Sequence, residues 1–182
     1  MNKILLILML LGSFLSGPSK EKQHIARQGQ VSFFSYTSVE NIEAKNNQVL
    51  SIIDFSKNEI AISMLMNAFT FKKSLMQEHF NESYIESDIY PKATFSGKII
   101  DFDALETAPQ TKIIKGDLTI HGITKETEIK VNIEKKGDSY SIQGDFEIEV
   151  KDFDIKIPPI LIPNIAQVIA IEFRFEYVPY EK

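Results

Sequence analysis

Three histidines are the residues whose side chains could most directly carry catalysis or bind a metal. His24, His79 and His121 lie far apart in the sequence, without an HExxH motif or a second ligand four residues along. Glu78 and His79 are adjacent, and adjacent residues on a helix do not face each other as an acid–base pair would. Ser83 lacks the G-x-S-x-G setting of a hydrolase nucleophile. We therefore expect no enzyme activity, no metal and no cofactor.

The overall composition narrows the function further. The 182 residues include 20 Lys or Arg and 25 Asp or Glu, for a net charge of −5, so nucleic acid is not an expected partner. The chain has no Cys, which excludes disulfides, thiolate zinc sites and a lipid-bearing N-terminal Cys. It has 13 Phe and no Trp, so most buried aromatic rings must be rings without a polar group.

The first 19 residues have the features of a secretory signal peptide. Lys3 is followed by the eight apolar residues Ile4–Leu11 and then by a segment rich in Gly and Ser. A membrane-spanning helix needs about 20 apolar residues, so we expect no integral membrane span; a buried N-terminal helix is the alternative. The sequence thus predicts a signal peptide over 1–19, one domain over 20–182, and a periplasmic or secreted location.

The rest of the chain shows the two-residue periodicity of β-strands. Apolar and polar side chains alternate through Ser139–Val150, Ile123–Glu134 and Val168–Val178, which is typical of strands with one buried face. The pattern predicts about eight strands in all. The five less regular ones are Gly29–Ser38, Ile42–Asp54, Glu59–Thr70, Ala93–Ile100 and Thr111–Ile120.

The connections between strands contain residues that favour turns. His121-Gly122 stands between two strands, which predicts a two-residue hairpin, and we assign His121 to the turn rather than to a metal. Lys72–Asn81 lacks Gly, Pro and β-branched residues, so it predicts a short helix. Ile155–Ile165 combines three prolines with apolar residues, which indicates a loop that either packs as a lid or binds a partner.

Eight antiparallel strands and one short α-helix predict a closed β-barrel. A barrel of this size is either filled by side chains or holds one small ligand. An outer-membrane barrel with an apolar outer band and a polar interior is the competing architecture. The helix, the proline-rich loop and the modest hydrophobicity of the strands favour the soluble barrel.

Four short segments, in this order, resemble a known family. They are His79-Phe80, Tyr90–Phe95 (YPKATF), Gly116–Lys125 (GDLTIHGITK) and Lys151–Ile155 (KDFDI). Their order and spacing resemble the YceI-like family over nearly the whole mature chain. The resemblance implies a mainly β, eight-stranded antiparallel lipocalin-like β-barrel in the periplasm or outside the cell, with a polyisoprenoid or similar amphipathic lipid inside.

The chain departs from the family pattern near the expected mouth of the barrel. Glu126 replaces the proline that commonly follows the Thr-Lys pair, and His121 replaces the Asn of the hairpin. Tyr84 and Ile85 stand where an acidic residue and a Phe are often found. These substitutions leave the predicted fold unchanged, but they bear on which ligand the barrel binds.

The candidate ligand-binding residues are mostly apolar, and most of them belong to a dense run around the junction of the third strand and the helix. Methionines adapt to irregular apolar ligands, although the same residues could simply fill the core. The candidates are Met64, Met66, Phe69, Phe71, Leu75, Met76, His79, Phe80, Phe95, Ile171 and Phe173.

These observations predict an exported lipid-binding protein that carries or sequesters a polyisoprenoid-like lipid. A homodimer is kept as a candidate assembly. One alternative is a structural or interaction module with a filled barrel and an exposed Ile155–Ile165 loop. The other is a secreted hydrolase in which His79 meets a carboxylate.

Overall fold

Nine antiparallel strands make up most of the computed structural model, which describes residues 23–37, 41–157 and 165–180. The predicted signal peptide and residues 158–164 of the proline-rich loop lie outside the described residues. The strands are β1 (Gln23–Ser35), β2 (Ile42–Asp54), β3 (Glu59–Leu65), β4 (Thr70–Phe71), β5 (Lys92–Ile99), β6 (Gln110–Ile120), β7 (Ile123–Lys136), β8 (Ser139–Glu149) and β9 (Val168–Pro179). The helical segments are η1 (Met66–Ala68), α1 (Ser74–His79), η2 (Phe80–Tyr84) and η3 (Val150–Phe153).

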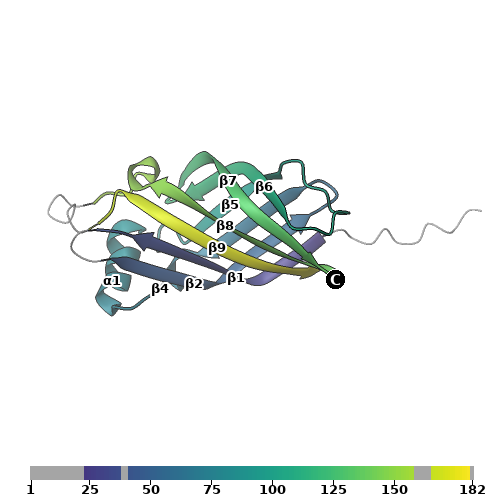
Figure 1. Cartoon of the computed structure of the whole chain (residues 1–182). Helices are drawn as coiled ribbons and strands as arrows, with labels where there is room; N and C mark the ends of the chain where they lie inside the picture. The colour runs from purple at the N-terminus through teal and green to yellow at the C-terminus, as the bar shows by residue number, and fades with distance from the viewer. Residues whose placement is uncertain (1–22, 38–40, 158–164, 181–182) are drawn as a thin grey trace, which may run out of the picture.

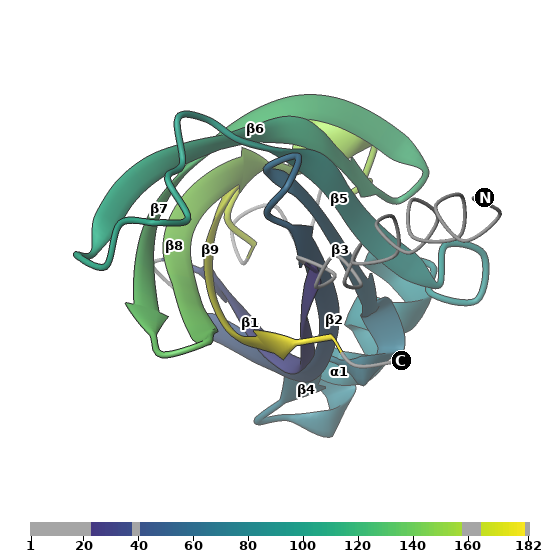
Figure 2. The same ribbon diagram turned by 90° about the vertical axis from the view of Figure 1, so that its right-hand side faces the viewer.

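Eight of these strands close into a barrel, as the sequence predicts. The order is β1-β9-β8-β7-β6-β5-β3-β2, and pairing of β1 with β2 closes the ring (Figure 2). The ninth strand, β4, has only two residues, which pair with Ala44 and Lys45 of β2 beyond the end of β3. The predicted fold class is therefore confirmed.

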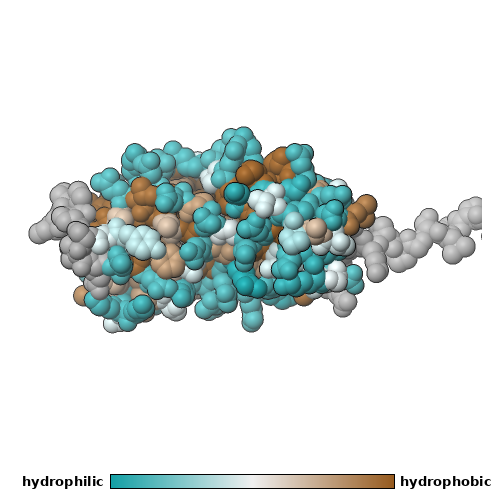
Figure 3. Space-filling view, in the orientation of Figure 1, coloured by the Kyte–Doolittle hydropathy of each residue, from teal (hydrophilic) through white to brown (hydrophobic). Residues whose placement is uncertain are grey.

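The alternation of side chains explains which face of each strand is buried. In β7, Ile129, Val131 and Ile133 are buried, while Lys130 and Glu134 between and beyond them are exposed. The side of the barrel that Figure 3 shows is accordingly mostly hydrophilic, with smaller hydrophobic areas. An outer-membrane barrel needs the opposite arrangement, with an apolar outer band and a polar interior. The burial pattern therefore favours the predicted barrel with an apolar interior and a polar outer face. Among the described residues, no helix has the length and apolar character needed to cross a membrane.

The predicted two-residue hairpin joins β6 to β7. His121 and Gly122 have φ angles of 50° and 75°, the left-handed pair that a type I′ turn requires. A Cβ atom at position 122 would lie 2.8 Å from the Tyr90 ring. Gly122 is therefore needed both for its conformation and for the close approach of Tyr90.

The two largest errors in the predicted strand boundaries each have a local reason. β1 begins at Gln23 rather than Gly29, because register shifts around Gly29 interrupt the alternation that marks a strand. The third strand ends at Leu65 rather than Thr70, since the chain turns into η1 and the Met66 N–H bonds to Pro91 O at 2.9 Å. The predicted helix is also shorter: α1 spans Ser74–His79 and continues as the π-helical turn η2.

The two ends of the barrel differ in how they are filled. At one end, which we call the filled end, Phe55 packs against Tyr140 and Phe102 with ring centroids 4.3 and 5.3 Å apart. Next to them Tyr177 is completely buried, and its hydroxyl lies 2.6 Å from Ser51 Oγ. The opposite end, which we call the open end, is where α1 lies beside the ends of β1 and β2 (Figure 1).

Candidate ligand cavity

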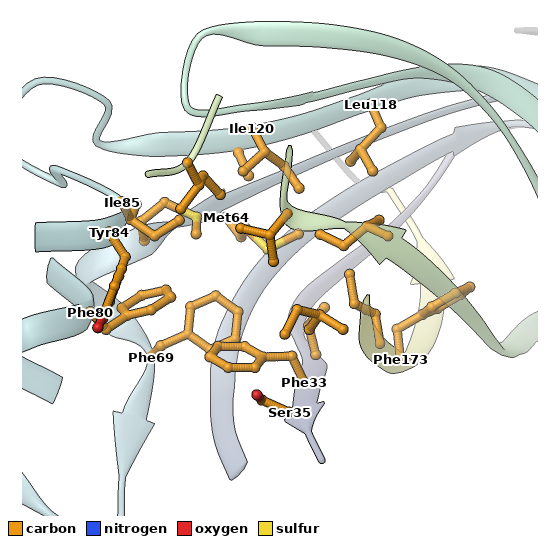
Figure 4. A pocket seen from close by; sticks show the side chains of 18 of the residues that line it. Phe33, Ser35, Met64, Phe69, Phe80, Tyr84, Ile85, Leu118, Ile120 and Phe173 are labelled. Carbon is orange, nitrogen blue, oxygen red and sulfur yellow. The ribbon is translucent and has the colours of Figure 1, made fainter. Parts of the chain in front are cut away.

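An apolar cavity of about 380 Å³ occupies the open end of the barrel. Thirty residues line it, and all but Ser35, His79 and Tyr84 are apolar. They come from the inner faces of the barrel strands, from α1 and η2, and from the segment that follows η3. Figure 4 shows side chains from several of these elements converging on the same space. The size matches the lower range of small-molecule sites in proteins.

The structure brings together ten of the eleven candidate ligand-binding residues. Those that line the cavity are Met64, Met66, Phe69, Phe71, Met76, His79, Phe80, Phe95, Ile171 and Phe173. Leu75 does not line it and is 60% exposed. Successive helical residues are turned by about 100°, so Leu75 points away while the next residue, Met76, faces inward. That these residues bind a ligand remains a prediction.

Much of the far wall was not among the candidates. Its residues lie on the strands β6–β9 and in the segment around η3, and examples are Ile114, Leu118, Ile120, Ile129, Phe146, Ile148 and Val150. Most of them occupy inward positions of regular strands. The alternation identifies them as inward-facing, but it does not tell whether an inward side chain meets a neighbour or a void.

Four phenylalanines form one wall of the cavity. Phe33 of β1 lies against Phe69, Phe71 and Phe80, with ring centroids 5.4 to 5.7 Å apart. Phe71 and Phe80 are also in contact at 5.1 Å. The Gln77 side chain of α1 accepts a hydrogen bond from the Phe71 N–H at 3.2 Å, which ties the helix to β4. The helix therefore positions two of the rings that shape the cavity.

The three polar side chains of the lining differ in their hydrogen-bond partners and in their burial. Ser35 Oγ already accepts a hydrogen bond from the Ala166 N–H at 3.0 Å. His79 lies at the exposed end of α1, and its side chain makes no hydrogen bond or ion pair with any described residue. Tyr84 is half-buried, and burial raises the pKa of its hydroxyl. Tyr84 therefore presents a neutral phenol to the cavity at neutral pH.

The sequence matches the model of the YceI-like domain over residues 23–177. The match covers nearly the whole barrel, including the four segments that carried the resemblance. The chain belongs to the YceI-like family. No curated protein matches the sequence.

Solved structures show the same barrel as this YceI-like chain. A polyisoprenoid-binding domain from Saccharophagus degradans has a TM-score of 0.76 at 14% identity, covering 88% of this chain and 100% of that domain. BcnA of Burkholderia cenocepacia has a TM-score of 0.69 at 18% identity, over 81% and 95% of the two chains. The YCEI protein of Campylobacter jejuni has a TM-score of 0.65 at 15% identity, over 81% and 90%. At these identities the likeness concerns the fold.

His121 holds together three segments beside the cavity. Its Nε2 lies 2.9 Å from Glu86 Oε2 and its Nδ1 lies 3.1 Å from Phe153 O, while the Tyr90 ring packs on the imidazole at 4.3 Å. The prediction that His121 belongs to the turn is confirmed by its φ of 50°, but the side chain does more than permit the turn. With 9% of its surface exposed, it links the β6–β7 hairpin to η3 and to the segment after η2. Sequence alone gave no signal for this contact, because the partners are 32 and 35 residues away.

The other residues considered for catalysis or metal binding lie apart. His24 packs at the filled end against Phe55 and Tyr140, and its Nε2 lies 2.8 Å from Asp138 O. In the KDFDI segment, Asp152 lies in η3 and Asp154 ends it in a left-handed conformation with φ of 51°, so both carboxylates belong to a turn. Within residues 23–37, 41–157 and 165–180, no three His, Asp or Glu side chains gather as a metal site would require.

Proposed function

We propose that this YceI-like barrel binds one amphipathic lipid with a long apolar chain, such as a polyisoprenoid, inside the open-end cavity. The observation that carries the proposal is the cavity itself, about 380 Å³ in volume and lined almost entirely by aliphatic, Met and Phe side chains. An apolar cavity of this kind offers a polar substrate few hydrogen-bond partners. The family and the Saccharophagus degradans domain, described as polyisoprenoid-binding, support the choice of lipid.

Burial of the chain is sufficient to account for binding. Each methylene removed from water contributes about 0.8 kcal/mol, so ten such groups contribute about 8 kcal/mol before the cost of immobilising the ligand. The branched methyl groups of an isoprenoid suit a lining that mixes Ile, Met and Phe. Affinity then depends on the length of chain that fits rather than on one polar contact.

We further infer that the protein is exported and carries or sequesters its lipid outside the cytoplasm. The support is the N-terminal sequence, in which Lys3 precedes the apolar run Ile4–Leu11. A lipid that is nearly insoluble in water needs its apolar chain shielded from water while it moves between membranes, and the interior of the barrel provides that shielding. Carriage or sequestration is a binding role, so it requires no catalytic group.

The two alternatives have less support. An interaction module needs a barrel filled by side chains, whereas the open end contains a cavity. A hydrolase using His79 needs a carboxylate beside it, and no described Asp or Glu forms an ion pair with His79.

Native mass spectrometry of the protein purified from its exported form tests the proposal. We expect an added mass that solvent extraction removes and identifies as a prenyl-chain lipid, and uptake of a prenyl chain by the stripped protein. A protein that carries no lipid and takes up none would refute lipid binding. Light scattering on the same sample distinguishes a monomer from the homodimer, and N-terminal sequencing locates the cleavage site.

A further inference from the structure

The strands β7 and β8 separate beside the cavity and leave a gap in the wall of the barrel. Their pairing ends at Val131 and Gly144. Both strands continue past that point, but there β7 pairs only with β6 and β8 pairs only with β9. The short helix η3 lies against both strands at the far side of the gap. We call this gap, bordered by residues 123–130 of β7, 145–149 of β8 and η3, the side window.

The cavity extends to the side window. Ile129 of β7 and Phe146 of β8 line the cavity from the two sides of the window. Phe146 is half-buried, whereas Ile142, at an inward position in the paired part of β8, is completely buried. Lys125 is the register partner of the cavity residue Leu118 and therefore lies on the same face of the sheet, yet it is exposed. Inward positions thus lose their cover at the window.

Another pair of strands separates half-way round the ring, but there the gap is closed. The pairing of β2 with β3 ends at Leu50 and Ser63. Beyond that point β4 pairs with β2, and Asn46 Nδ2 donates a hydrogen bond to Leu65 O at 2.9 Å. The cluster of four phenylalanine rings around Phe33 packs behind this region. Strand pairing and aromatic packing therefore block this side, whereas the side window is bridged by η3.

The two ends of η3 are tied to neighbouring segments. The Val150 N–H donates a hydrogen bond to Gln167 O at 2.9 Å, and Phe153 O lies 3.1 Å from Nδ1 of His121 in the β6–β7 hairpin. The side chains of Val150 and Phe153 are buried, so η3 stays closed at rest. A four-residue helix held at its ends can move aside without unpairing any barrel strand, and such lightly held segments are the ones that open locally.

We infer that the lipid enters and leaves the cavity through the side window, and that η3 moves aside to let the apolar chain pass. The inference rests on the proposed function and adds the route of exchange. On this route the chain stays between the apolar side chains of Ile129 and Phe146. At the open end, by contrast, α1, η2 and the segment that follows η3 border the cavity and stand in the way.

A crosslink from β7 to β8 across the side window tests the route. The chain has no Cys, so Glu128→Cys together with Glu147→Cys introduces one reactive pair at exposed positions on the two sides of the window. A short bis-maleimide joins the thiols without the strict geometry of a disulfide. We expect the crosslink to slow uptake of a fluorescently labelled prenyl alcohol, and its release from preloaded protein, at least about tenfold. The equilibrium affinity should stay the same, because neither residue lines the cavity.

Asp117→Cys together with Glu126→Cys is the matched control. These exposed residues are register partners on the paired strands β6 and β7, so the same linker there should leave both rates unchanged. Unchanged rates after crosslinking of the window, or equal slowing by the control crosslink, refute entry through the side window. If the protein without a crosslink takes up no prenyl alcohol, the proposed function itself fails, so the two failures are distinguishable.

His121→Asn tests the movement of η3 without a crosslink. Loss of the bond to Phe153 O frees one end of η3 and should speed both uptake and release about threefold. Tyr177→Phe removes a hydrogen bond at the filled end, controls for a general loss of stability, and should leave both rates unchanged. Unchanged exchange in His121→Asn, or equal acceleration in the two variants, contradicts the role assigned to η3.

Discussion

The filled end and the open end of this barrel are built from the same strands but have different interiors. At the filled end, the centroids of the Phe55, Phe102 and Tyr140 rings lie within 6.2 Å of one another. At the open end, Phe33 and its neighbours line one wall and leave about 380 Å³ between them and the far wall. Both ends use inward apolar side chains, so strand alternation alone does not decide between core and cavity.

The difference arises where the connections between strands place their side chains. The β2–β3 turn and the β5–β6 loop contribute Phe55 and Phe102 to the filled end. Lys135 Nζ donates to Ala104 O at 2.8 Å and holds that loop against the barrel. At the open end, β7 pairs with β8 only as far as Val131 and Gly144. The strands separate beyond that pair, and η3, α1 and η2 form walls around the space.

Truncation of an aromatic ring should give the largest difference in the free energy of unfolding between the two ends. We expect Phe55→Ala to lower the free energy of unfolding by about 3–5 kcal/mol, because it opens a void in close-packed surroundings. Phe71→Ala, at a half-buried ring that already borders the cavity, should cost clearly less. Chemical denaturation of both variants measures the difference, and equal losses would contradict the distinction between the two ends.

Enlarging a side chain should also cost more stability in the filled core than at the cavity. Ile142→Trp places a large ring in the fully buried part of the core and should destabilise the protein by about 1–3 kcal/mol. Leu118→Trp projects into the cavity (Figure 4), so we expect a cost below about 1 kcal/mol and at least tenfold weaker lipid binding. The chain has no Trp of its own, so the fluorescence of each new residue reports its burial. Unimpaired lipid binding by Leu118→Trp would show that the cavity is not the binding site.

Substitutions of His121 test how much its contacts beside the cavity contribute to stability. His121→Asn keeps a residue that tolerates the left-handed turn but loses the bonds to Glu86 and Phe153, and should cost about 1–3 kcal/mol. His121→Ala should cost about 1 kcal/mol more, because Ala is strained at φ of 50°. Thermal and chemical unfolding compare the two variants. A fully stable His121→Asn protein would mean that the side chain serves only the turn.

The smallest expected effect at neutral pH concerns Tyr177 at the filled end. Ser51 Oγ donates to Ala61 O, so the Tyr177 hydroxyl donates to Ser51, and Tyr177→Phe should cost about 1 kcal/mol. Burial raises the pKa of Tyr177 well above its usual range. In the unfolded chain this phenol ionises above pH about 10, whereas in the folded protein it stays neutral.

The stability that the neutral Tyr177 hydroxyl provides is therefore present below pH about 10 and is lost as the pH rises further. We expect the stability gap between the wild type and Tyr177→Phe to shrink above that pH. Tyr84→Phe, at a half-buried phenol of the open end, should change the pH profile less. A constant gap for Tyr177→Phe from pH 8 to 11 would show that Tyr177 ionises normally.

Much of the fold could be predicted from particular residues. The alternation in Ile123–Glu134 and Ser139–Val150 located β7 and β8 to within two residues at each end. The pair His121-Gly122 located the hairpin between β6 and β7. Prediction failed where local pattern and structure diverge, as at the bulges around Gly29 and at the turn after Leu65.

The candidate site was predicted in part, and for a physical reason. A dense run of Met and Phe around the third strand and the helix indicated apolar surface, and ten of the eleven candidate residues from that run and from other strands line the cavity. Leu75 was wrongly placed on the inner face, because a six-residue helix offers too few turns to fix its orientation from sequence. Tyr84 was noted only as a departure from the family pattern, since its free hydroxyl depends on what surrounds it.

The sequence by itself determined the strand content, the hairpins, the apolar inner face and the absence of cysteine chemistry, because each depends on local periodicity or composition. Only the tertiary structure decided where the barrel is filled and where it is hollow. That outcome depends on Phe55, Phe102 and His121, which lie in connections between strands and contact residues far away in the chain. The 13 phenylalanines therefore serve two purposes: some close one end of the barrel and eight line the cavity at the other.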